Sequence, residues 1–234
     1  MADTSATPLR PLPEDWSRAL FVVAHPDDVE YGAGAAVAKW VAQGKTVAYV
    51  MMTSGEQGIE GMTPEVCGPL REKEQIASSK IVGVHDVRFL RFPDFTLENT
   101  PELRAALTEV LRDFRPDIVL TLNFRGSWGE GFENSADHMN AGAAVVDAVR
   151  EAGGGVRFIA AASSPQSGHA VDVTGYEDVA IASLREHRAY LEGLGGEAES
   201  LTMIREGLAA AGKQFGSPSA VSFELIDVAG ATRA

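Results

Sequence analysis

The sequence is poor in cysteine, because Cys67 is the only one among 234 residues. A single cysteine excludes an internal disulfide framework. It also excludes zinc fingers and zinc ribbons, whose sites need two or more thiolates. No apolar run is long enough to span a bilayer, and the N-terminal stretch MADTSATPLRPLPEDW has no apolar signal core. These absences predict a cytoplasmic protein with no membrane partner and a short irregular arm over residues 1–17.

Positive charge is also scarce, since 20 lysines and arginines stand against 33 aspartates and glutamates, for a net charge of −13. The basic residues form no cluster that would offset this balance. An acidic surface repels phosphate backbones and anionic lipid headgroups, which argues against a nucleic-acid partner. Hydrophobic residues make up 45% of the chain and charged residues 23%, both ordinary globular values. The length predicts a single domain over residues 1–234.

Several catalytic signatures are missing. The sequence has no GxxxxGK[ST] phosphate loop, no HExxH helix and no GxSxG turn. Gly32-Ala33-Gly34 superficially resembles a dinucleotide loop, but a true fingerprint would directly follow the strand. Here His25-Pro26-Asp27-Asp28 intervenes, and its acids would repel a pyrophosphate. No dinucleotide site is therefore predicted, and the glycines indicate close packing of a helix on a sheet.

Apolar runs and helical patterns alternate along the chain. Helices are expected between successive strands, and the expected strands are residues 19–24, 45–53, 86–90, 117–122 and 156–161. The expected helices are about residues 29–44, 70–82, 101–114 and 136–151. This alternation predicts an α/β fold with a mostly parallel sheet and helices on both faces. Residues 176–234 are expected to add helices at about 176–193 and 199–213 and a closing strand at 222–228.

The clearest chemical signal is His25-Pro26-Asp27-Asp28, which follows the most apolar predicted strand and precedes a helix. In open α/β sheets, ligands bind beyond the carboxyl ends of the strands. Imidazole and carboxylate groups are good zinc ligands, and the helix dipole holds both acids ionised. His138, at the start of the helix after the fourth strand, could complete a set of two histidines and one carboxylate. Taken separately, the turn is typical of an Asp helix cap and His138 of a surface residue.

The motif Ala24-His25-Pro26-Asp27-Asp28, with Gly32-x-Gly34 after it, closely resembles the opening signature of the PIG-L/LmbE-like zinc-dependent N-deacetylases. Further matches follow in order, namely Gly55-Glu56-Gln57-Gly58, Arg71-Glu72-x-Glu74, Pro93-Asp94, Arg115-Pro116-Asp117 and Asp137-His138. The resemblance covers roughly residues 19–195. It implies a Rossmann-like three-layer fold and one bound zinc ion (Zn²⁺).

By this resemblance, the zinc ligands are His25, Asp28 and His138, and Asp27 is the general base. Arg71 and Asp94 match positions that contact the sugar-like part of the substrate. The resemblance therefore implies a hydrolase that removes an N-acetyl group from a small amino-sugar conjugate through metal-activated water. Members of the family often associate, so a homo-oligomer is also expected.

The sequence departs from the family at Ser135, where the family usually has a histidine three residues before the last ligand. That imidazole is assigned to oxyanion stabilisation or to acid catalysis. His169 and His187 are the candidates to replace it. His187 lies on a predicted apolar stripe, which favours a packed core histidine. His169 precedes a short predicted strand at 171–173 and could point into the crevice.

Two other candidates have both a functional and a structural interpretation. Trp128 lies in a glycine-rich loop at residues 126–131 and could stack on a sugar, or it could simply anchor the loop to the surface. The charged run around Arg71 is typical of a solvated helix face. Only the family resemblance singles out Arg71 within that run.

Two further functions stay open on the sequence alone. One is an amidase of a thiol–sugar conjugate of the mycothiol type, with the same fold. The other is a non-catalytic nucleotide- or sugar-binding α/β protein. The second alternative predicts no stoichiometric metal and no loss of function in His25→Ala, so metal analysis separates it from the hydrolases.

Overall fold

The computed structural model describes residues 8–129 and 131–228. The described strands are β1 (Arg10–Pro11), β2 (Arg18–Val23), β3 (Thr46–Met51), β4 (Asp86–Phe89), β5 (Ile118–Leu122), β6 (Ser127–Gly129), β7 (Phe132–Glu133), β8 (Ile159–Ala162), β9 (His169–Asp172) and β10 (Ala220–Ile226). The described helices are α1 (Asp28–Ala42), α2 (Pro64–Ile81), α3 (Pro101–Phe114), α4 (Ala136–Ala152), α5 (Glu177–Leu184), α6 (Arg188–Gly193) and α7 (Ala198–Phe215).

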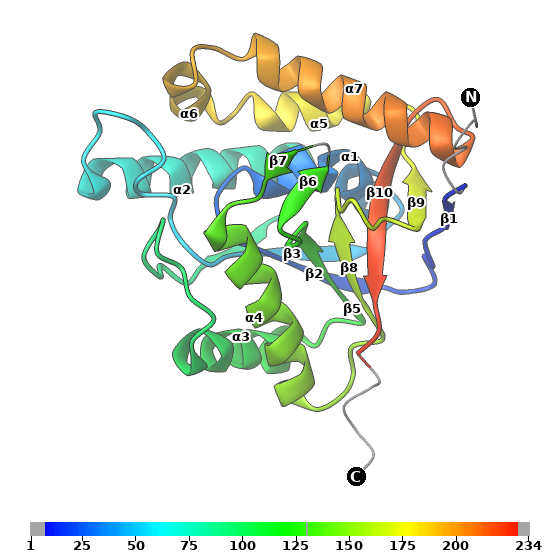
Figure 1. The fold of residues 1–234 in the computed structure, drawn as a ribbon, viewed down its shortest axis with the longest axis horizontal. Coiled ribbons are helices and arrows are strands. Elements are labelled where there is room, and N and C mark those ends of the chain that lie inside the picture. Colours follow the sequence, from blue (N-terminus) through cyan, green and yellow to red (C-terminus); the bar gives the residue numbers. More distant parts are fainter. Residues whose placement is uncertain (1–7, 130, 229–234) are drawn as a thin grey trace.

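The centre of the molecule is an eight-stranded sheet with the order β1-β9-β10-β8-β5-β2-β3-β4 (Figure 1). Strands β8, β5, β2, β3 and β4 run parallel to one another. Strand β10 is antiparallel to both of its neighbours, β8 and β9. The predicted α/β fold with a mostly parallel sheet is confirmed. Because the five parallel strands end at the same edge, the loops that follow them gather there.

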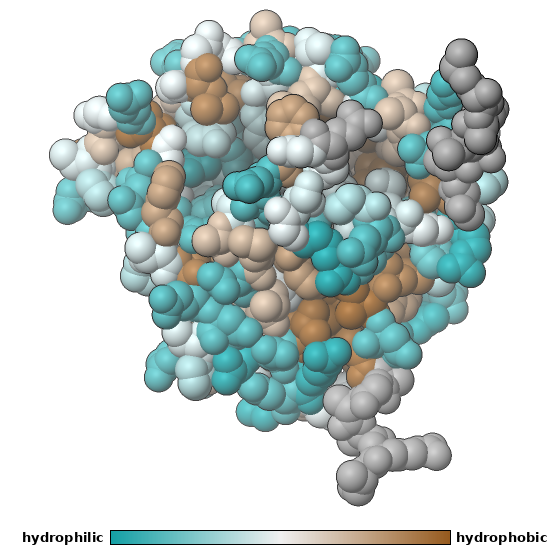
Figure 2. Space-filling model, viewed as in Figure 1, coloured by the Kyte–Doolittle hydropathy of each residue, from teal (hydrophilic) through white to brown (hydrophobic). Residues whose placement is uncertain are grey.

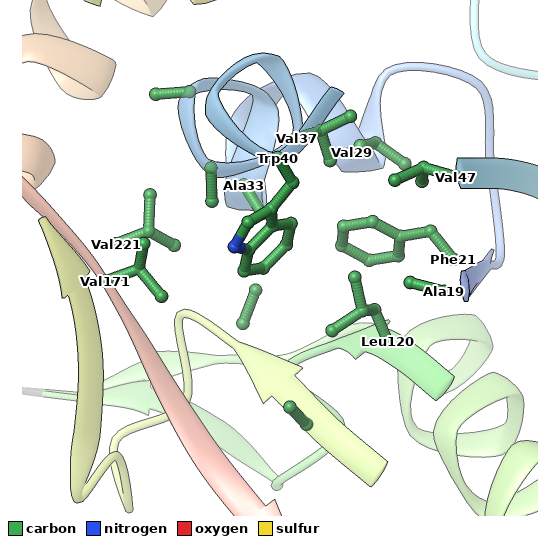
Figure 3. Packing of buried hydrophobic residues seen from close by; sticks show 14 of the residues in the cluster. Ala19, Phe21, Val29, Ala33, Val37, Trp40, Val47, Leu120, Val171 and Val221 are labelled. Atoms are coloured by element: carbon green, nitrogen blue, oxygen red, sulfur yellow. The ribbon is translucent and has the colours of Figure 1, made fainter. Parts of the chain in front are cut away.

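One face of the sheet packs against α1 through large apolar side chains (Figure 3). Phe21 from β2 and Leu120 from β5 lie next to Trp40 from α1, and all three are fully buried. Burying a side chain of this size stabilises a fold by about 1.5–3 kcal/mol. On the opposite face, α3 and α4 pack on each other and on the sheet.

The described part of the N-terminal arm is packed against the domain. Trp16 meets Trp40 edge to face with 5.1 Å between ring centroids, and the Trp40 indole N–H donates to Glu14. Strand β1 lies within the segment expected to be irregular and pairs in parallel with β9. The arm is therefore held by a strand pair and by a buried aromatic contact.

The C-terminal elements cross the edge where the parallel strands end. Helix α7 runs above the start of β10, and α5 lies beside it (Figure 1). Figure 2 shows that hydrophilic residues dominate this side of the molecule, with one apolar patch over β8 and β10. None of the helices in the described ranges combines the length and the apolar character that a bilayer crossing requires.

Three local features differ from the sequence expectations. Helix α2 begins at Pro64 rather than near residue 70, because the helix continues through Gly68 and Pro69. The segment expected to be one helix at 176–193 is two helices, α5 and α6, with His187 at the break. The glycine-rich loop contributes β6, which pairs with β7 just beyond the loop in a small two-stranded sheet.

Candidate active site

The His25–Asp28 turn follows β2 and begins α1. The backbone N–H of His25 donates to Asp28 Oδ2 at 2.8 Å, and the N–H of Asp27 donates to Gln75 Oε1 at 2.8 Å. Asp27 adopts a left-handed conformation with φ +88°, which Asp tolerates better than most residues. This backbone directs the two carboxylates differently: Asp28 faces His138, while Asp27 faces Arg71.

Three side chains from two loops meet at one point beyond the ends of β2 and β5. His138 Nε2 lies 3.1 Å from Asp28 Oδ1, and His25 Nδ1 lies 3.7 Å from Asp28 Oδ2. The two imidazole rings stand edge to face with centroids 5.2 Å apart. One ligand atom from each of the three residues lies within 4.8 Å of the others. The structure thus brings together the three side chains that the sequence analysis proposed as ligands.

The other nitrogen of each imidazole faces an acceptor. His25 Nε2 lies 3.1 Å from Asp94 Oδ1 and 3.2 Å from Asp137 Oδ2. His138 Nδ1 lies 2.9 Å from Asn134 Oδ1, which also accepts the backbone N–H of Ser135. A metal-binding histidine usually donates its remaining N–H to such an acceptor, which fixes the tautomer. This geometry leaves His25 Nδ1 and His138 Nε2 as the nitrogens directed at Asp28.

The donor set fits a divalent transition metal. In a tetrahedral zinc site, nitrogen and oxygen ligands lie about 2.0–2.2 Å from the ion, so they stand roughly 3.3 Å apart. The separations of 3.1 and 3.7 Å within the three-residue cluster bracket that value. Two imidazoles and one carboxylate also leave a position for water or substrate.

The charges around the cluster are strongly coupled. Burial disfavours the imidazolium form of His25, but hydrogen bonds to Asp137, Asp28 and Asp94 raise its pKa well above the usual value. Burial would raise the pKa of Asp28, yet His138 and His25 outweigh burial and hold that pKa below its usual value. Without a cation, a proton on His25 therefore balances the surrounding carboxylates, and a bound cation would replace that proton.

Asp27 lies in the same cavity but is held by different groups. Its Oδ2 atom is 3.3 Å from the Arg71 guanidinium and accepts no hydrogen bond, although it is buried. Burial raises the pKa of Asp27 to about 6, against the lowering effect of Arg71. A carboxylate with a pKa near neutrality is suited to accept and return a proton.

Arg71 belongs to the charged run that resembles a solvated face, but its side chain is buried. It donates to the carbonyls of Pro26 and Gly55, and its guanidinium stacks on the Tyr190 ring at 4.1 Å. A Cβ atom added at Gly55 or Gly58 would come within 2.3 Å of Arg71 Nη1, so both glycines make room for the guanidinium. These contacts hold Arg71 against Asp27, and its contact with substrate stays a prediction.

Asp94 is also buried, and its position is set by the loop after β3. Glu56 accepts the backbone N–H of Asp94 at 2.9 Å, and the backbone N–H of Gln57 donates to Asp94 Oδ2 at 2.9 Å. The carboxylate lies beside His25 Nε2 while lining the cavity. In this structure Asp94 orients a candidate ligand, and its predicted substrate contact is untested.

A cavity of about 890 Å³ opens at the candidate ligands. Trp128 from β6 lines it and meets His138 edge to face at 5.7 Å. His169 is not among its lining residues, and β9 lies four strand positions from β2, which places it roughly 19 Å from the candidate ligands' strand. His187 is fully buried, 3.7 Å from Glu30, and neither of its ring nitrogens has a hydrogen-bond partner. Neither histidine therefore lies where the missing family imidazole would be.

Ser135 has a structural role in the loop before α4. Its hydroxyl accepts the backbone N–H of His138 at 3.1 Å, so it caps the helix that carries this candidate ligand. Ser135, and not the neighbouring Asp137, is therefore the N-cap of α4. Asp137 instead accepts the backbone N–H of Phe95 at 2.8 Å and lies beside His25.

The sequence did not indicate three contacts that position the candidate site. They are the contact of Gln75 with the Asp27 backbone, of Asn134 with His138, and of Asp137 with His25. Gln75 lies one residue beyond the Arg71-Glu72-x-Glu74 match, and Asn134 lies just before Ser135. Only the adjacency of Asp137 to a candidate ligand offered a signal. The partners of the other two are fixed by contacts between segments far apart in the chain.

The chain is similar to several characterised proteins. A family model described as PIG-L, GlcNAc-PI de-N-acetylase, matches residues 20–149, more than half of the chain. The 1D-myo-inositol 2-acetamido-2-deoxy-alpha-D-glucopyranoside deacetylase of Acidothermus cellulolyticus is 32% identical, over 64% of this chain and 59% of that protein. The diacetylchitobiose deacetylase of Thermococcus kodakarensis is 34% identical, over 59% of this chain and 51% of that protein.

Among solved structures, the N,N'-diacetylchitobiose deacetylase from Pyrococcus horikoshii, complexed with its inhibitor MPG, matches with a TM-score of 0.83. The match covers 92% of this chain and 86% of that chain at 24% identity, so it shows a shared fold. The chain spans only about half to three-fifths of the length of the two curated relatives. The segment matched by the family model includes His25, Asp28 and His138. The protein is thus a member of the PIG-L (GlcNAc-PI de-N-acetylase) family.

Proposed function

We propose that the protein is a zinc-dependent hydrolase that removes an N-acetyl group from a small amino-sugar substrate. The observation that carries this proposal is the meeting of His25, Asp28 and His138 within 4.8 Å, with Asp27 in the same cavity. The relatives in the family are named as deacetylases of N-acetylated amino sugars, which supports the substrate class. A cytoplasmic location and association with further copies stay predictions.

In this proposal His25, Asp28 and His138 hold the zinc ion. A bound zinc ion supplies a Lewis acid that polarises an amide carbonyl and lowers the pKa of water to about 7. Asn134, Asp94 and Asp137 orient the two imidazoles so that their free nitrogens face the ion's position. Such outer contacts also make the ligands more basic.

Asp27 accepts the proton of the attacking water and returns it to the leaving amine. The bond that breaks is the amide C–N bond, and the products are acetate and a free amine. Arg71 keeps Asp27 ionised before attack, and Gln75 fixes the Asp27 backbone. Because its pKa is about 6, Asp27 can both take and release a proton near neutral pH.

The test combines metal analysis with an acetate-release assay on N-acetylglucosamine, N,N'-diacetylchitobiose and an N-acetylglucosaminyl inositol. We expect about one zinc ion per chain, lost in His25→Ala and in Asp28→Ala. Asp27→Asn should retain zinc but lose turnover by about 10²–10⁴-fold, the usual contribution of a positioned acid–base group. Asp178→Asn is a matched control, because Asp178 is exposed on α5 and lies outside the cavity.

The same experiment separates the alternatives. A binding protein without catalysis would hold no stoichiometric metal and release no acetate from any substrate. A thiol–sugar amidase would cleave a larger acyl group faster than acetyl on the same amine. Near-normal turnover in Asp27→Asn would overturn the assignment of the base.

A further inference from the structure

Helices α1, α2 and α5 enclose a cluster of buried polar side chains beside the candidate base. Each member is at most 2% exposed, and we call the cluster the Glu30 network: Glu30, Gln75, Ser78, Ser183 and His187. Burying polar groups is unfavourable unless they are paired or hydrogen-bonded, so such a cluster needs internal contacts. One contact leaves the cluster, because Gln75 accepts the backbone N–H of Asp27. The network is therefore joined directly to the residue that takes the proton in the proposed reaction.

The carboxamide of Gln75 must point one way for this contact to form. Its Oε1 atom accepts the N–H of Asp27 at 2.8 Å, and its Nε2 atom donates to Glu30 Oε1 at 2.9 Å. Rotating the amide by half a turn would place its NH₂ group against the N–H of Asp27, and two donors form no hydrogen bond. A carboxylate only accepts, so Glu30 binds the NH₂ end of the amide and not its oxygen end. Glu30 therefore selects the orientation of Gln75 that Asp27 requires.

Glu30 is itself held by side chains of α2 and of the segment around α5. Ser78 donates to Glu30 Oε1 at 2.6 Å, and the Ser78 hydroxyl lies 2.7 Å from that of Ser183. Glu30 Oε2 has no hydrogen-bond partner among the described residues, but it lies 3.7 Å from His187 Nε2. Burial lowers the pKa of His187, yet the Glu30 carboxylate outweighs burial and raises that pKa above its usual value. His187 thus supplies the opposite charge that a buried carboxylate needs.

The Asp27 backbone depends on its contact with Gln75. Asp27 has φ +88°, a sparsely populated conformation that persists only where surrounding contacts hold it. The hydrogen bond to Gln75 ties this conformation to α2. The direction of the Asp27 carboxylate follows from its backbone, and displacing a catalytic group by about 1 Å can cost roughly 10²-fold in rate. A group that fixes Gln75 therefore acts on the placement of the base.

We propose that Glu30 is a positioning residue for Asp27, acting through the Gln75 carboxamide, and that His187 is the counter-ion that holds Glu30 in place. His187, a sequence candidate for the missing family imidazole, thus acts behind the base and not on the substrate. This inference rests on the proposed hydrolase function for its effect on turnover. The orientation of Gln75 and the Asp27 backbone can be measured without turnover, so the two ideas can fail separately.

The first test follows the Asp27 amide without substrate, by nitrogen-15 NMR and hydrogen exchange in the presence of zinc. Glu30→Met keeps the length of the side chain but removes both acceptor oxygens. Gln75 then loses the contact that orients it, so the Asp27 amide should exchange about two- to tenfold faster, as weakening of one hydrogen bond predicts. Glu30→Gln retains an oxygen that accepts from Gln75 and should restore slow exchange. The amide of Leu20 in β2 reports general destabilisation and should change less.

The second test measures kcat and KM in the zinc-loaded protein, on whichever of N-acetylglucosamine, N,N'-diacetylchitobiose and an N-acetylglucosaminyl inositol releases acetate fastest. Glu30→Met should lower kcat by about 10–100-fold with little change in KM, because a displaced base weakens an interaction made only in the transition state. Glu30→Gln should recover most of that loss. Ser79→Ala is the matched control, since Ser79 is buried on α2 and its hydroxyl donates to the Ile76 carbonyl in its own helix.

The Asp27→Asn chain separates positioning from a general loss of structure. If Glu30 acts through Asp27, Glu30→Met should lower kcat no further once Asp27 is replaced. A merely destabilised fold would lower kcat by the same factor in both chains.

A double variant tests the part assigned to His187. His187→Leu alone should lower kcat, whereas Glu30→Met with His187→Leu should lose no more kcat than Glu30→Met, because both residues act along one path. The double variant removes both buried charges together, so it should fold even if a single substitution does not.

The outcomes distinguish the two ideas. An Asp27 amide exchange and a kcat that both stay native in Glu30→Met, or in the double variant, would overturn the role of Glu30 even if acetate is released. Equal losses of kcat in the native and Asp27→Asn chains would overturn it as well. Faster exchange at Asp27 without hydrolysis of any substrate would instead sink the hydrolase and leave the contact from Glu30 through Gln75 standing.

Discussion

Two adjacent aspartates with different surroundings are the central feature of the candidate site at the residue scale. The left-handed backbone at Asp27 and the hydrogen bond from its N–H to Gln75 turn the carboxylate away from Asp28. The proximity of His25 and Asp28 could be predicted, because both belong to one short motif. The role of Gln75 could not be predicted, because it lies 48 residues away from Asp27 and reaches it only in the folded chain.

Asn134 should affect the metal without touching it. Its side-chain oxygen accepts from His138 Nδ1, so Asn134→Ala removes the group that fixes this imidazole. We expect zinc affinity to fall by about 10–100-fold, measured by competition with a chromogenic chelator. Asn140→Ala is the control, since Asn140 lies on α4 together with His138 but donates to the Leu97 carbonyl. An unchanged zinc affinity in Asn134→Ala would contradict the assigned orientation of His138.

Arg71 should set the pH range of activity through Asp27. The working form of Asp27 is the carboxylate, so activity should fall below its pKa, which is about 6 without a bound cation. A bound cation lowers that value, which places the acid limb of kcat/KM at or below pH 6. Because the guanidinium favours the carboxylate, Arg71→Met should move the limb upward by about 1–3 pH units. Arg71→Lys keeps the charge and should shift it less. A pH profile in Arg71→Met that matches the native one would show that Arg71 does not act on Asp27.

Most helices and strands could be predicted from local patterns, but their interruptions could not. The apolar run at residues 19–24 locates β2 to within one residue, because a strand buried on both faces needs apolar side chains throughout. The break between α5 and α6 has a different origin, since Glu74 on α2 accepts the backbone N–H of Ala189 at 2.6 Å. A helix start that is stabilised from another helix leaves no periodic signal in its own residues.

The motif Arg115-Pro116-Asp117, one of the family matches, has a structural explanation at the scale of the elements. Asp117 stands at the start of β5, and its carboxylate accepts the backbone N–H groups of Ser17 and Arg18 at 2.8 and 2.9 Å. We expect Asp117→Ala to lower the free energy of unfolding by about 2 kcal/mol, as the loss of charge-assisted hydrogen bonds predicts. Urea unfolding followed by circular dichroism measures it. Asp113→Ala removes an exposed ion pair with Arg88 and should cost less than about 1 kcal/mol. Equal losses of unfolding free energy in the two variants would show that the hydrogen bonds from Ser17 and Arg18 to Asp117 stabilise the fold no more than an exposed ion pair does.

At the scale of the whole molecule, the candidate metal site connects segments that are distant in the chain. His25 and Asp28 follow β2, while His138 begins α4, so a cation held by all three joins the first and third quarters of the sequence. A ligand that binds only the folded state stabilises it in proportion to its affinity and concentration. The proton that His25 carries without a cation must also leave when the cation binds.

Zinc should therefore raise the melting temperature and release protons. At a free zinc concentration 100 times its Kd, the stabilisation is about 2.7 kcal/mol, which corresponds to roughly 5–11 °C in a chain of this size. Calorimetry in buffers of different ionisation enthalpy should report proton release, and zinc affinity should weaken as the pH falls. His25→Ala should show neither effect. A zinc-dependent rise in Tm that persists in His25→Ala would place the metal elsewhere.

The wall that α7 contributes to the cavity lies outside residues 20–149, the segment shared with the family, whereas every candidate zinc ligand lies inside it. The candidate ligands and the α7 wall of the cavity therefore come from separate stretches of the chain. Exchanging α7 and β10, residues 198–226, between relatives is a route to chimeras that keep the candidate metal site and change one wall of the cavity. Substitutions in α7 can likewise change which substrates the cavity accepts without altering the candidate metal ligands.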